Sequence, residues 1–481
     1  MTGVTKSFLQ GSVLSLLNQS GNKIVGMLST LILVRLLLPE DFGVIAITLL
    51  IINVTESLGD LGPSNYIIQK KDLIDSDVNT AWTLTLSIKI LISASLILLT
   101  PVFSTFFDTE SLTTTLPILA LGMVIAGFAS PKLLVMGRNM EYGIPFKISI
   151  LQKITSASGT VIAAFIFRDY RALVVGHLLS TISYLTFSYY FAYQKPIFTL
   201  INIKNQWSFS RWIVKSTVIG QIRGNIDSGF AAKFLGVEFI GPYQIMKYYS
   251  SLPLSLLVQP ILTPLVAALS KIKDNTYHFN KQFEKICLLM GSLALILFTV
   301  LHGMSTTIVF VIFGENWVDY SYIFKMFSYF LIVSPVSICF GKALVSMGKV
   351  KPIFVFDMIA LGLLVFVVGG MLVFAGITST SFIYVKVGAD ILMASGLCIY
   401  SFNLLALTLN KFWIKLFLLY VGNLLFYSFV INLTYFDSVL IWLNELIVVS
   451  ISLLFNLFIS LIFFRTDFKA ILLQIIRINT K

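Results

Sequence analysis

Apolar stretches of roughly 20 residues follow one another along almost the whole chain, separated by short polar segments. A stretch of about 20 residues spans the hydrocarbon core of a bilayer as an α-helix, whereas barrel strands would alternate over about 10 residues. Only 12% of the residues are charged, against about 25% in soluble domains, and the mean hydropathy is +0.91. The sequence therefore predicts an all-α, polytopic membrane protein.

The apolar stretches predict fourteen transmembrane helices in three groups. We expect an N-terminal six-helix bundle at 1–205, a pseudo-symmetric C-terminal six-helix bundle at 206–410, and two extra helices with a cytoplasmic tail at 411–481. The expected helices cover residues 11–34, 42–62, 80–107, 114–136, 148–167, 171–193, 212–234, 239–270, 286–312, 320–347, 353–375, 380–409, 414–434 and 440–464.

The distribution of basic residues predicts how these helices are oriented. If the N-terminus is cytoplasmic, 21 of the 34 Lys and Arg residues fall in inside segments, 10 lie within helices, and the outside segments hold only Arg35, Arg168 and Arg171. Cytoplasmic loops of membrane proteins carry this excess of positive charge, so we expect both termini in the cytoplasm. The net charge of +12 arises largely in these loops and does not indicate a nucleic acid partner.

The short loops leave no room for a soluble catalytic or nucleotide-binding domain. The sequence contains none of the motifs GxxxxGKS/T, HExxH and GxSxG, so we expect neither an enzyme nor catalytic residues. The cysteines lie inside apolar stretches without metal or redox spacing and are expected to be small buried side chains. We expect no metal site, and the three histidines are scattered.

Two octets separated by 198 residues indicate an internal repeat. Residues 36–43 read LLLPEDFG and residues 234–241 read FLGVEFIG. Each octet links the first and second helices of a predicted half, so the repeat would be parallel, and such repeats usually place a binding site between the halves. On the letters alone chance remains an alternative, because Leu and Gly are common here. The matching positions are Leu37 and Leu235, Glu40 and Glu238, and Gly43 and Gly241.

The first predicted helix carries a polar face. An ionisable side chain at mid-bilayer costs at least about 2.5–3.5 kcal/mol and usually marks function. Ser15, Gln19, Lys23, Gly26 and Thr30 recur at three- and four-residue steps and so share one side of the helix, with Lys23 near the bilayer middle. This face is broadened by Asn18, Asn22 and Ser29. We expect this face to line a wet cavity, with a polar contact to another helix as the alternative.

The second and twelfth helices hold candidate coupling or supporting residues. Glu56 is expected either to pair with Lys23 or Arg35 or to carry a proton, and Asp60 continues its face toward the cytoplasm. In the twelfth helix the i,i+4 spacing of Lys386 and Asp390 allows an ion pair. These residues form the supporting set: Glu56, Arg35, Lys386 and Asp390.

The seventh predicted helix repeats the pattern of the first. Ser216, Gly220, Arg223 and Asp227 share a face, and Arg223 is central. The i,i+4 spacing lets Arg223 and Asp227 pair, which would be structural, while the remaining donors of Arg223 suit a phosphate. Lys247 lies about two turns into the eighth helix, in which four prolines predict a static bend or a hinged cavity wall: Pro242, Pro253, Pro260 and Pro264.

The embedded charges favour an anionic substrate. With Lys132 and Lys415 counted among the inside segments, ten Lys and Arg residues stand against six Asp and Glu residues within the predicted helices, and one of the ten, Lys89, lies deeper than the cations near the helix ends. A net positive interior attracts anions and disfavours organic cations, which would want unpaired carboxylates and aromatic walls. We therefore predict a central cavity between the two halves, with the substrate bound by Lys23, Arg223, Asp227 and Lys247.

The segment after the first helix resembles a known family signature. Residues 33–44, LVRLLLPEDFGV, resemble the R-x-L-x-P-x-D/E-F/Y-G signature of Wzx-type polysaccharide-unit flippases of the multidrug/oligosaccharidyl-lipid/polysaccharide superfamily. Residues 56–62, ESLGDLG, leading to residues 68–70, IQK, are also similar to that family. The resemblance covers the layout of the whole chain, with two six-helix halves and two extra helices.

The resemblance implies a multi-pass protein of the bacterial inner membrane. Such a protein would turn undecaprenyl-pyrophosphate-linked oligosaccharide units from the cytoplasmic to the periplasmic leaflet, by alternating access, for the assembly of lipopolysaccharide O-antigen or exopolysaccharide. It implies no cofactor and coupling to a proton or sodium gradient. Expected partners are the lipid-linked oligosaccharide, the bilayer, a polysaccharide polymerase and a chain-length regulator, and we expect a monomer.

Two other functions stay open. An ion-coupled drug antiporter of the same superfamily should show an acidic cavity, which the net positive interior argues against. A membrane-embedded polysaccharide polymerase generally needs a sizeable outside loop to bind sugars, whereas the outside loops predicted here are about ten residues or fewer.

Overall fold

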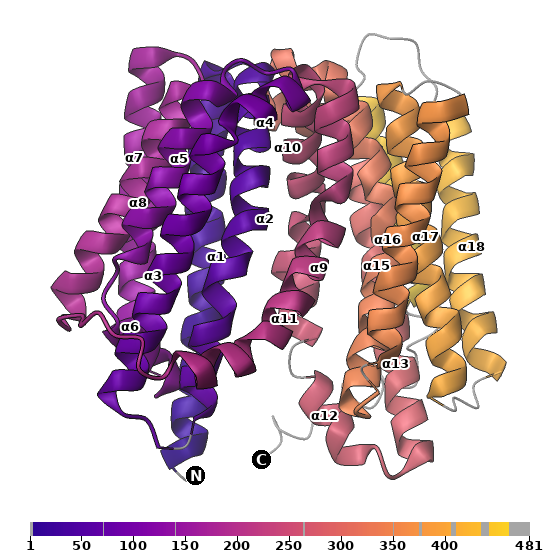
Figure 1. Cartoon of the computed structure of the whole chain (residues 1–481). Helices are drawn as coiled ribbons and strands as arrows, with labels where there is room; N and C mark the ends of the chain where they lie inside the picture. Colours follow the sequence, from indigo (N-terminus) through magenta and orange to yellow (C-terminus); the bar gives the residue numbers. More distant parts are fainter. Residues whose placement is uncertain are drawn as a thin grey trace, which may run out of the picture. The chain divides into compact units, whose positions relative to one another are not determined.

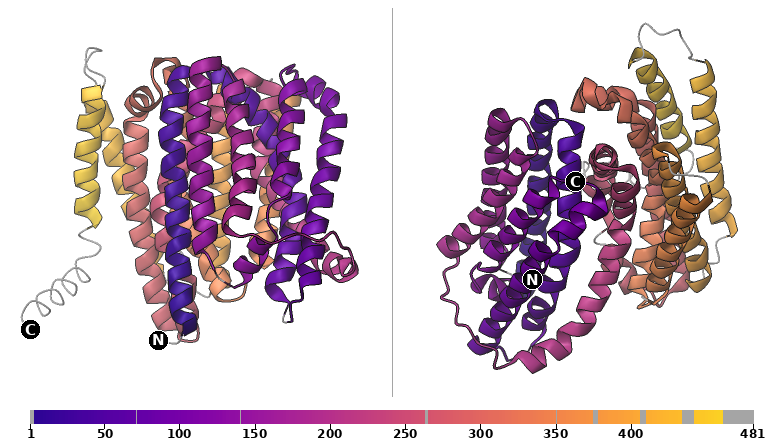
Figure 2. Two further views of the ribbon diagram at one scale, coloured as in Figure 1. Left: turned by 90° about the vertical axis from the view of Figure 1, so that its left-hand side faces the viewer. Right: turned by 45° about the horizontal axis from the view of Figure 1, so that its top comes forward.

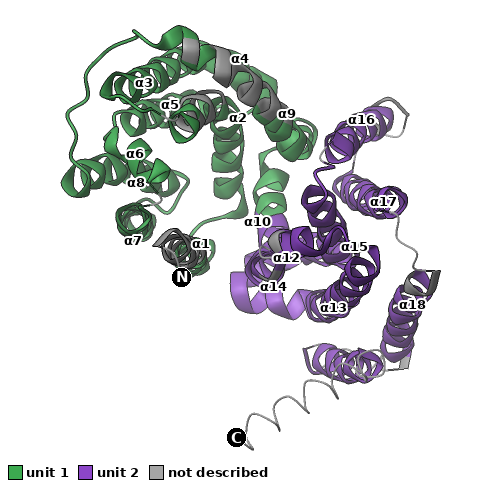
Figure 3. Ribbon diagram, turned by 90° about the horizontal axis from the view of Figure 1, so that it is seen from below, with its two compact units in different colours: residues 1–244 green, residues 245–481 purple. Residues whose placement is uncertain are grey.

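The computed structural model of the chain describes residues 3–70, 72–139, 141–262, 265–349, 351–374, 378–405, 410–433 and 442–460. These residues are almost all helical and contain no strand. They form two compact units, which we call unit 1 (residues 1–244) and unit 2 (residues 245–481) (Figure 3). The predicted cytoplasmic tail beyond residue 460 and the outside loop around Asp437 lie outside the described residues.

Unit 1 is built on the long helix α2, which packs against α3, α5 and α9, while α7 packs against α1 and α8. Its long helices run alongside one another (Figures 1 and 2). The helices are α1 (Gly3–Leu36), α2 (Pro39–Gln69), α3 (Asp75–Leu98), α4 (Thr100–Phe107), α5 (Leu112–Gly127), α6 (Lys132–Arg138), α7 (Gly143–Phe167), α8 (Arg171–Phe191), α9 (Ile203–Leu235) and the part of α10 (Val237–Pro253) up to Gln244.

Unit 2 is centred on α15, which packs against α12, α13, α14 and α17. The eighth predicted helix contains a π-helical turn, Leu254–Val258, directly after Pro253, which cannot donate a backbone hydrogen bond. The remaining helices are α11 (Gln259–Leu262), α12 (Leu265–Ile272), α13 (Thr276–Gly303), α14 (Ser305–Phe313), the 3₁₀-helix Glu315–Tyr320, α15 (Ser321–Ser346), α16 (Lys351–Phe374), α17 (Ser379–Leu404), α18 (Asn410–Leu433) and a last helix, Trp442–Ser460.

The all-α, membrane-spanning fold predicted from the sequence is confirmed. Each of the fourteen predicted stretches contains helix. Within the described residues, nine helices are long and apolar enough to cross a membrane, or ten if α5 and α6 form one span bent by 68°. The predicted number of fourteen spans is therefore not confirmed. The helices with the predicted polar faces, α1, α2 and α9, are not among the nine.

The turn between α1 and α2 explains the signature segment in physical terms. Pro39 occupies the first position of α2, where its missing N–H and fixed φ are favourable. Asp41 accepts a hydrogen bond from the backbone N–H of Leu38 (2.9 Å) through one oxygen, and from that of Tyr170 (2.9 Å) through the other. One carboxylate therefore holds the start of α2 and joins it to the start of α8.

The two glycines of the internal repeat meet each other in unit 1. A Cβ built on Gly43 would lie 2.0 Å from the carbonyl oxygen of Val237, and one built on Gly241 would lie 2.2 Å from that of Pro39. Gly43 and Gly241 are separated by 198 residues, and so are Pro39 and Val237. Each octet thus contacts the other through equivalent positions, which is the reciprocal contact that a two-fold axis generates. This contact supports the internal repeat.

We expect Gly43→Ala and Gly241→Ala each to lower stability by about 1–3 kcal/mol, because an added methyl group must displace backbone atoms. The measurement is the thermal unfolding midpoint of the detergent-purified protein. Gly220→Ala is the matched control, since no atom lies within 4 Å of its Cβ position and Ala favours a helix interior over Gly by up to about 1 kcal/mol. Equal midpoints for Gly43→Ala and Gly220→Ala would contradict the close contact.

A buried polar network holds α18 to the rest of unit 2. The two ring nitrogens of His302 in α13 lie 2.7 Å from the hydroxyl of Tyr427 in α18 and 2.9 Å from that of Tyr329 in α15. Because the bilayer offers no water, a polar contact of this kind replaces the hydration that each group loses. His302, which looked scattered in the sequence, thus joins three helices.

Candidate functional site

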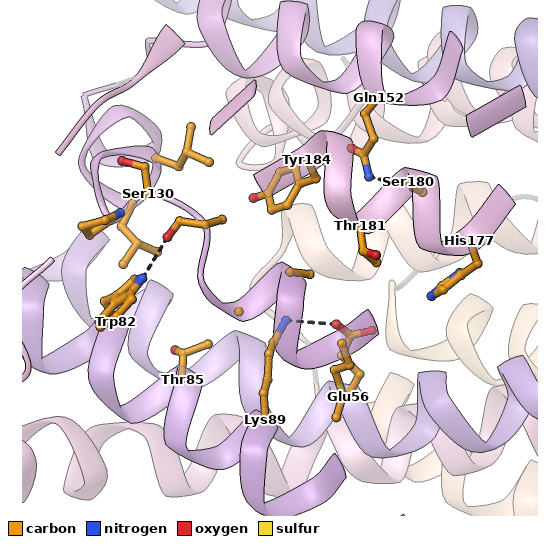
Figure 4. A pocket seen from close by; sticks show the side chains of 17 residues that line it. Glu56, Trp82, Thr85, Lys89, Ser130, Gln152, His177, Ser180, Thr181 and Tyr184 are labelled. Carbon is orange, nitrogen blue, oxygen red and sulfur yellow. Dashed lines mark hydrogen bonds and ion pairs between the residues drawn. The ribbon is translucent and has the colours of Figure 1, made fainter. Parts of the chain in front are cut away.

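Unit 1 encloses a cavity of about 460 Å³ between α2, α3, α5, α6, α7 and α8 (Figure 4). Its lining is mixed, with small and aliphatic side chains beside polar ones. All lining residues belong to unit 1, so the cavity is complete within that unit. The side chains that can bond to a ligand or ion are Glu56, Thr85, Lys89, Ser130, Gln152, His177, Ser180, Thr181 and Tyr184.

A helix break forms one wall of this cavity. The chain leaves the helical path between α5 and α6, just before Pro131, which has no backbone N–H to continue the hydrogen-bond ladder. The carbonyl oxygens exposed there are occupied: that of Phe128 accepts from the hydroxyl of Tyr189 (3.0 Å), and that of Ala129 accepts from Trp82 Nε1 (2.8 Å). Non-helical backbone at membrane depth occurs where it is buried or lines a cavity, and broken helices often build transporter ion sites.

An ion pair joins α2 and α3 across the cavity. Lys89 Nζ lies 3.0 Å from Glu56 Oε1, and the side chains are 7% and 30% exposed. Gly127 makes room for the lysine stem, since a Cβ there would lie 3.1 Å from Lys89 Cδ. Glu56 forms no other hydrogen bond with the part of the chain that the structure describes. The carboxylate therefore holds a buried ammonium group and still reaches the cavity.

Uncharged hydrogen-bonding groups from α7 and α8 face this pair. Gln152 Nε2 donates to Ser180 Oγ (2.9 Å), which links the two helices. Figure 4 shows Gln152, Ser180 and Tyr184 across the cavity from Lys89, with His177 beyond Glu56. The arrangement offers one carboxylate, one ammonium and an imidazole in a polar chamber, which suits the uptake and release of a proton or small cation.

The structure corrects the expected partner of Glu56. The sequence suggested Lys23 or Arg35, but the carboxylate pairs with Lys89 because α2 packs against α3 and both residues point into the same cavity. Arg35 lies exposed in the last turn of α1. The side chain of Asp60 lies outside the described residues.

The polar face of α1 is in part a helix contact. Asn22 Nδ2 donates to Ser149 Oγ of α7 (2.8 Å), and a Cβ on Gly26 would lie 3.3 Å from Lys153 Nζ. The alternative of a polar contact to another helix therefore holds for this part of the face, because α1 packs against α7. Lys23 is half-buried, and no hydrogen bond or ion pair joins it to the described part of the chain.

Asp227 and Arg223 of α9, the seventh predicted helix, differ in burial. Asp227 is buried, and its Oδ2 accepts a hydrogen bond from the hydroxyl of Tyr243 (2.6 Å). Arg223, one turn earlier, is exposed. The side chain of Ser216 lies outside the described residues.

In unit 2, the predicted pair of α17 is confirmed, with Lys386 Nζ 2.7 Å from Asp390 Oδ1. Lys247 is half-buried in α10. Because Lys23, Arg223 and Asp227 belong to unit 1 and Lys247 to unit 2, the shared cavity expected between the halves stays a prediction.

Several cavity residues were missed from the sequence. His177 looked scattered, and Trp82, Gln152 and Tyr184 gave no periodic signal. Lys89 was visible as a deep intramembrane cation, but a sequence alone does not say which helix it faces. The one local signal for the broken helix is Pro131 within an apolar stretch.

We expect Lys89→Met to destabilise the protein by about 1–3 kcal/mol, less than for a fully buried pair, because it leaves the half-buried Glu56 carboxylate without its counter-charge. Adding Glu56→Gln should recover most of the loss. Arg171→Met is the control, since the Arg171–Asp169 pair is 60% and 28% exposed and such pairs contribute about 0–1 kcal/mol. Thermal unfolding of the four purified proteins measures these effects. A Lys89→Met midpoint equal to that of Arg171→Met would show that the pair adds nothing to stability.

Residues 32–322 match the family described as "Polysaccharide biosynthesis protein". An uncharacterized membrane protein in the cps region of Klebsiella pneumoniae is 28% identical over 304 residues, covering 61% of this chain and 62% of that protein, less than two thirds of its length. The lipopolysaccharide biosynthesis protein WzxC of Escherichia coli (strain K12) is 23% identical over 376 residues, or 76% of this chain and 75% of that one.

Among solved structures, the lipid II flippase MurJ in an inward closed conformation shares the fold. The TM-score is 0.74 at 15% sequence identity, covering 96% of this chain and 100% of that chain. The likeness therefore extends over almost the entire chain, well beyond the segment that matches the family.

Proposed function

We propose that this chain, which belongs to the polysaccharide biosynthesis protein family, is a flippase for undecaprenyl-pyrophosphate-linked oligosaccharide units. It would move them from the cytoplasmic to the periplasmic leaflet of the bacterial inner membrane, with both of its termini in the cytoplasm. The observation that carries the proposal is the combination of this family with the fold of a lipid flippase over 96% of the chain. A polymerase and a chain-length regulator would act on the same product, and the flippase itself would work as a monomer.

The chemistry of the head group fits the embedded cations. A pyrophosphate brings two or more negative charges, which several cations bind better than one, and the planar fork of Arg223 suits phosphate oxygens. Lys23, Lys247 and Arg223, assisted by Asp227, would receive it in the cavity between the halves. The lipid tail would stay in the bilayer while the head group crosses by alternating access.

The rival functions fit these observations less well. A drug antiporter of the same superfamily would bind organic cations, and the ten embedded basic residues would repel them. A polymerase would need a sugar-binding outside domain, whereas the described connections of unit 1 are short turns, apart from the segment between α8 and α9. That segment lies along α3, where Ile197 N donates to Asn79 Oδ1 (3.1 Å).

We further propose that the Glu56–Lys89 pair couples transport to a proton gradient. The titratable side chains of the cavity are Glu56 from α2, Lys89 from α3, and His177 and Tyr184 from α8. Protonation of Glu56 would remove the negative charge that lies 3.0 Å from the buried ammonium group of Lys89, which favours a rearrangement of α3 relative to α2. Since α2 packs along α9, the change would reach the helix that carries Arg223. Sodium fits less well, because an ammonium group already fills the cation position.

Arg223→Ala and Lys23→Ala should each abolish polymer export when they replace the wild-type gene in a flippase-null strain, without lowering membrane abundance. Arg171→Ala, an exposed arginine at the start of α8, should export normally. Arg223→Lys separates two modes of binding: partial export indicates charge attraction, and none indicates bidentate geometry. Normal export by both alanine variants at normal abundance would remove these cations from the site.

Glu56→Gln should uncouple transport from the pH gradient. In sealed vesicles that contain lipid-linked oligosaccharide, an imposed pH gradient should accelerate flipping by the wild type. The Glu56→Gln variant should flip slowly, at the same rate with and without the pH gradient. Glu110→Gln, an exposed residue between α4 and α5, is the control. Full dependence of Glu56→Gln on the pH gradient would exclude the pair as the coupling site. If a sodium gradient alone accelerates flipping by the wild type, the coupling ion is sodium and not the proton.

A further inference from the structure

A second, apolar groove lies on unit 1 and shares no lining residue with the polar cavity. Side chains of α2, α4 and α9 line a volume of about 360 Å³. The wall is formed by Leu50 and Val54 of α2, Phe106 of α4, and Ile226, Phe230 and Phe234 of α9. Apart from one asparagine and one lysine, the lining is glycine and hydrocarbon.

The groove has the dimensions of one lipid chain in one leaflet. Along α9 it extends from Ile222 to Phe234, or about 18 Å at 1.5 Å per residue. One leaflet of a bilayer has a hydrocarbon depth of about 15 Å. Aromatic pairs stiffen both sides: the rings of Phe106 and Phe107 are 4.9 Å apart, and those of Phe230 and Phe234 are 6.0 Å apart.

The only charge in the groove's lining is Lys233, at the end formed by the last turn of α9. Its Nζ donates to the carbonyl oxygen of Phe106 (2.6 Å) and lies 4.9 Å from the centre of that ring. An ammonium group has three donors, and this is the one hydrogen bond that Lys233 makes with the described residues. The amide of Asn225 instead bonds to its own helix, at Gln221 O (2.9 Å). The groove therefore has an apolar length and one cationic end.

We propose that this groove holds the part of the lipid carrier's isoprenoid chain that lies next to its phosphate, with the phosphate at Lys233. The inference rests on the proposed function and adds to it a place for the tail. A single chain fills the groove, whereas the second chain of a phospholipid would have no place in it. Arg223 lies ten residues before Lys233 on α9, about 15 Å away along the helix. The phosphate would then move from one cation to the other along α9 while the tail lies beside it.

The test uses the full-length protein in vesicles of phosphatidylethanolamine and phosphatidylglycerol that contain a minor fraction of undecaprenyl phosphate. A small diazirine-bearing aliphatic residue replaces Ile226 in the groove or, as control, Ile162 of α7, which is 60% exposed and outside the groove. After illumination, mass spectrometry identifies the attached lipid. At position 226 we expect undecaprenyl phosphate about tenfold above its share of the lipid, an affinity difference of about 1.4 kcal/mol, and no enrichment at position 162.

Two second-site variants identify the cause of the enrichment. Lys233→Ala should reduce it to the level of position 162, and Lys233→Arg should retain it. Gly229→Leu should also remove it, because the Cβ position of Gly229 is open and a leucine there would fill the groove. Adducts at position 226 that follow the bulk lipid composition, or an enrichment that survives both Lys233→Ala and Gly229→Leu, would overturn the proposal.

Export in cells separates this proposal from the proposed function. If the wild type restores polymer export but position 226 shows no enrichment, the groove assignment fails and the flippase stands. If enrichment is found but the wild type restores no export, the lipid site stands and the flippase assignment fails.

Discussion

Hydrocarbon supplies no hydrogen bonds, and this constraint accounts for most of what is unusual in the chain. A continuous helix satisfies its own backbone, so each interruption must be satisfied by side chains. The break at Pro131 exposes two carbonyl groups, and Trp82 and Tyr189 donate to them. Trp82 itself lines the polar cavity of unit 1. The cavity and the satisfied break are therefore parts of one arrangement, in which the interruption between α5 and α6 makes room for polar groups.

The sequence predicts the helices well because their signal is local. The composition of each stretch of about 20 apolar residues is enough to predict a helix, and each of the fourteen contains helix in the described part of the chain. The number of spans is harder to obtain, because α1, α2 and α9 carry many polar residues and so lose the composition of a simple span. Hydropathy alone therefore does not find these three helices.

The candidate site was predictable only in part, because pairing depends on which helix faces which. Glu56 was recognisable as a deep carboxylate, and Lys89 as a deep cation, yet their separation of 33 residues gives no hint that they touch. The pair Lys386–Asp390, by contrast, lies within one helix, so its spacing alone predicts the contact. The polar face of α1 left two alternatives open for a similar reason, since only the neighbouring helix α7 decides that Asn22 makes a helix contact.

The reciprocal contact between the octets around Gly43 and Gly241 bears on how such a chain could have arisen. If both halves descend from one six-helix ancestor, two copies of it related by a two-fold axis would have made this same contact with each other. In that ancestral dimer, any mutation of the glycine would have altered the contact twice. Gene duplication and fusion removed this restriction, because each half can now change separately. The position that holds proline in the first octet, Pro39, already holds a different residue in the second, Val237, while the glycines that the close approach requires are the same.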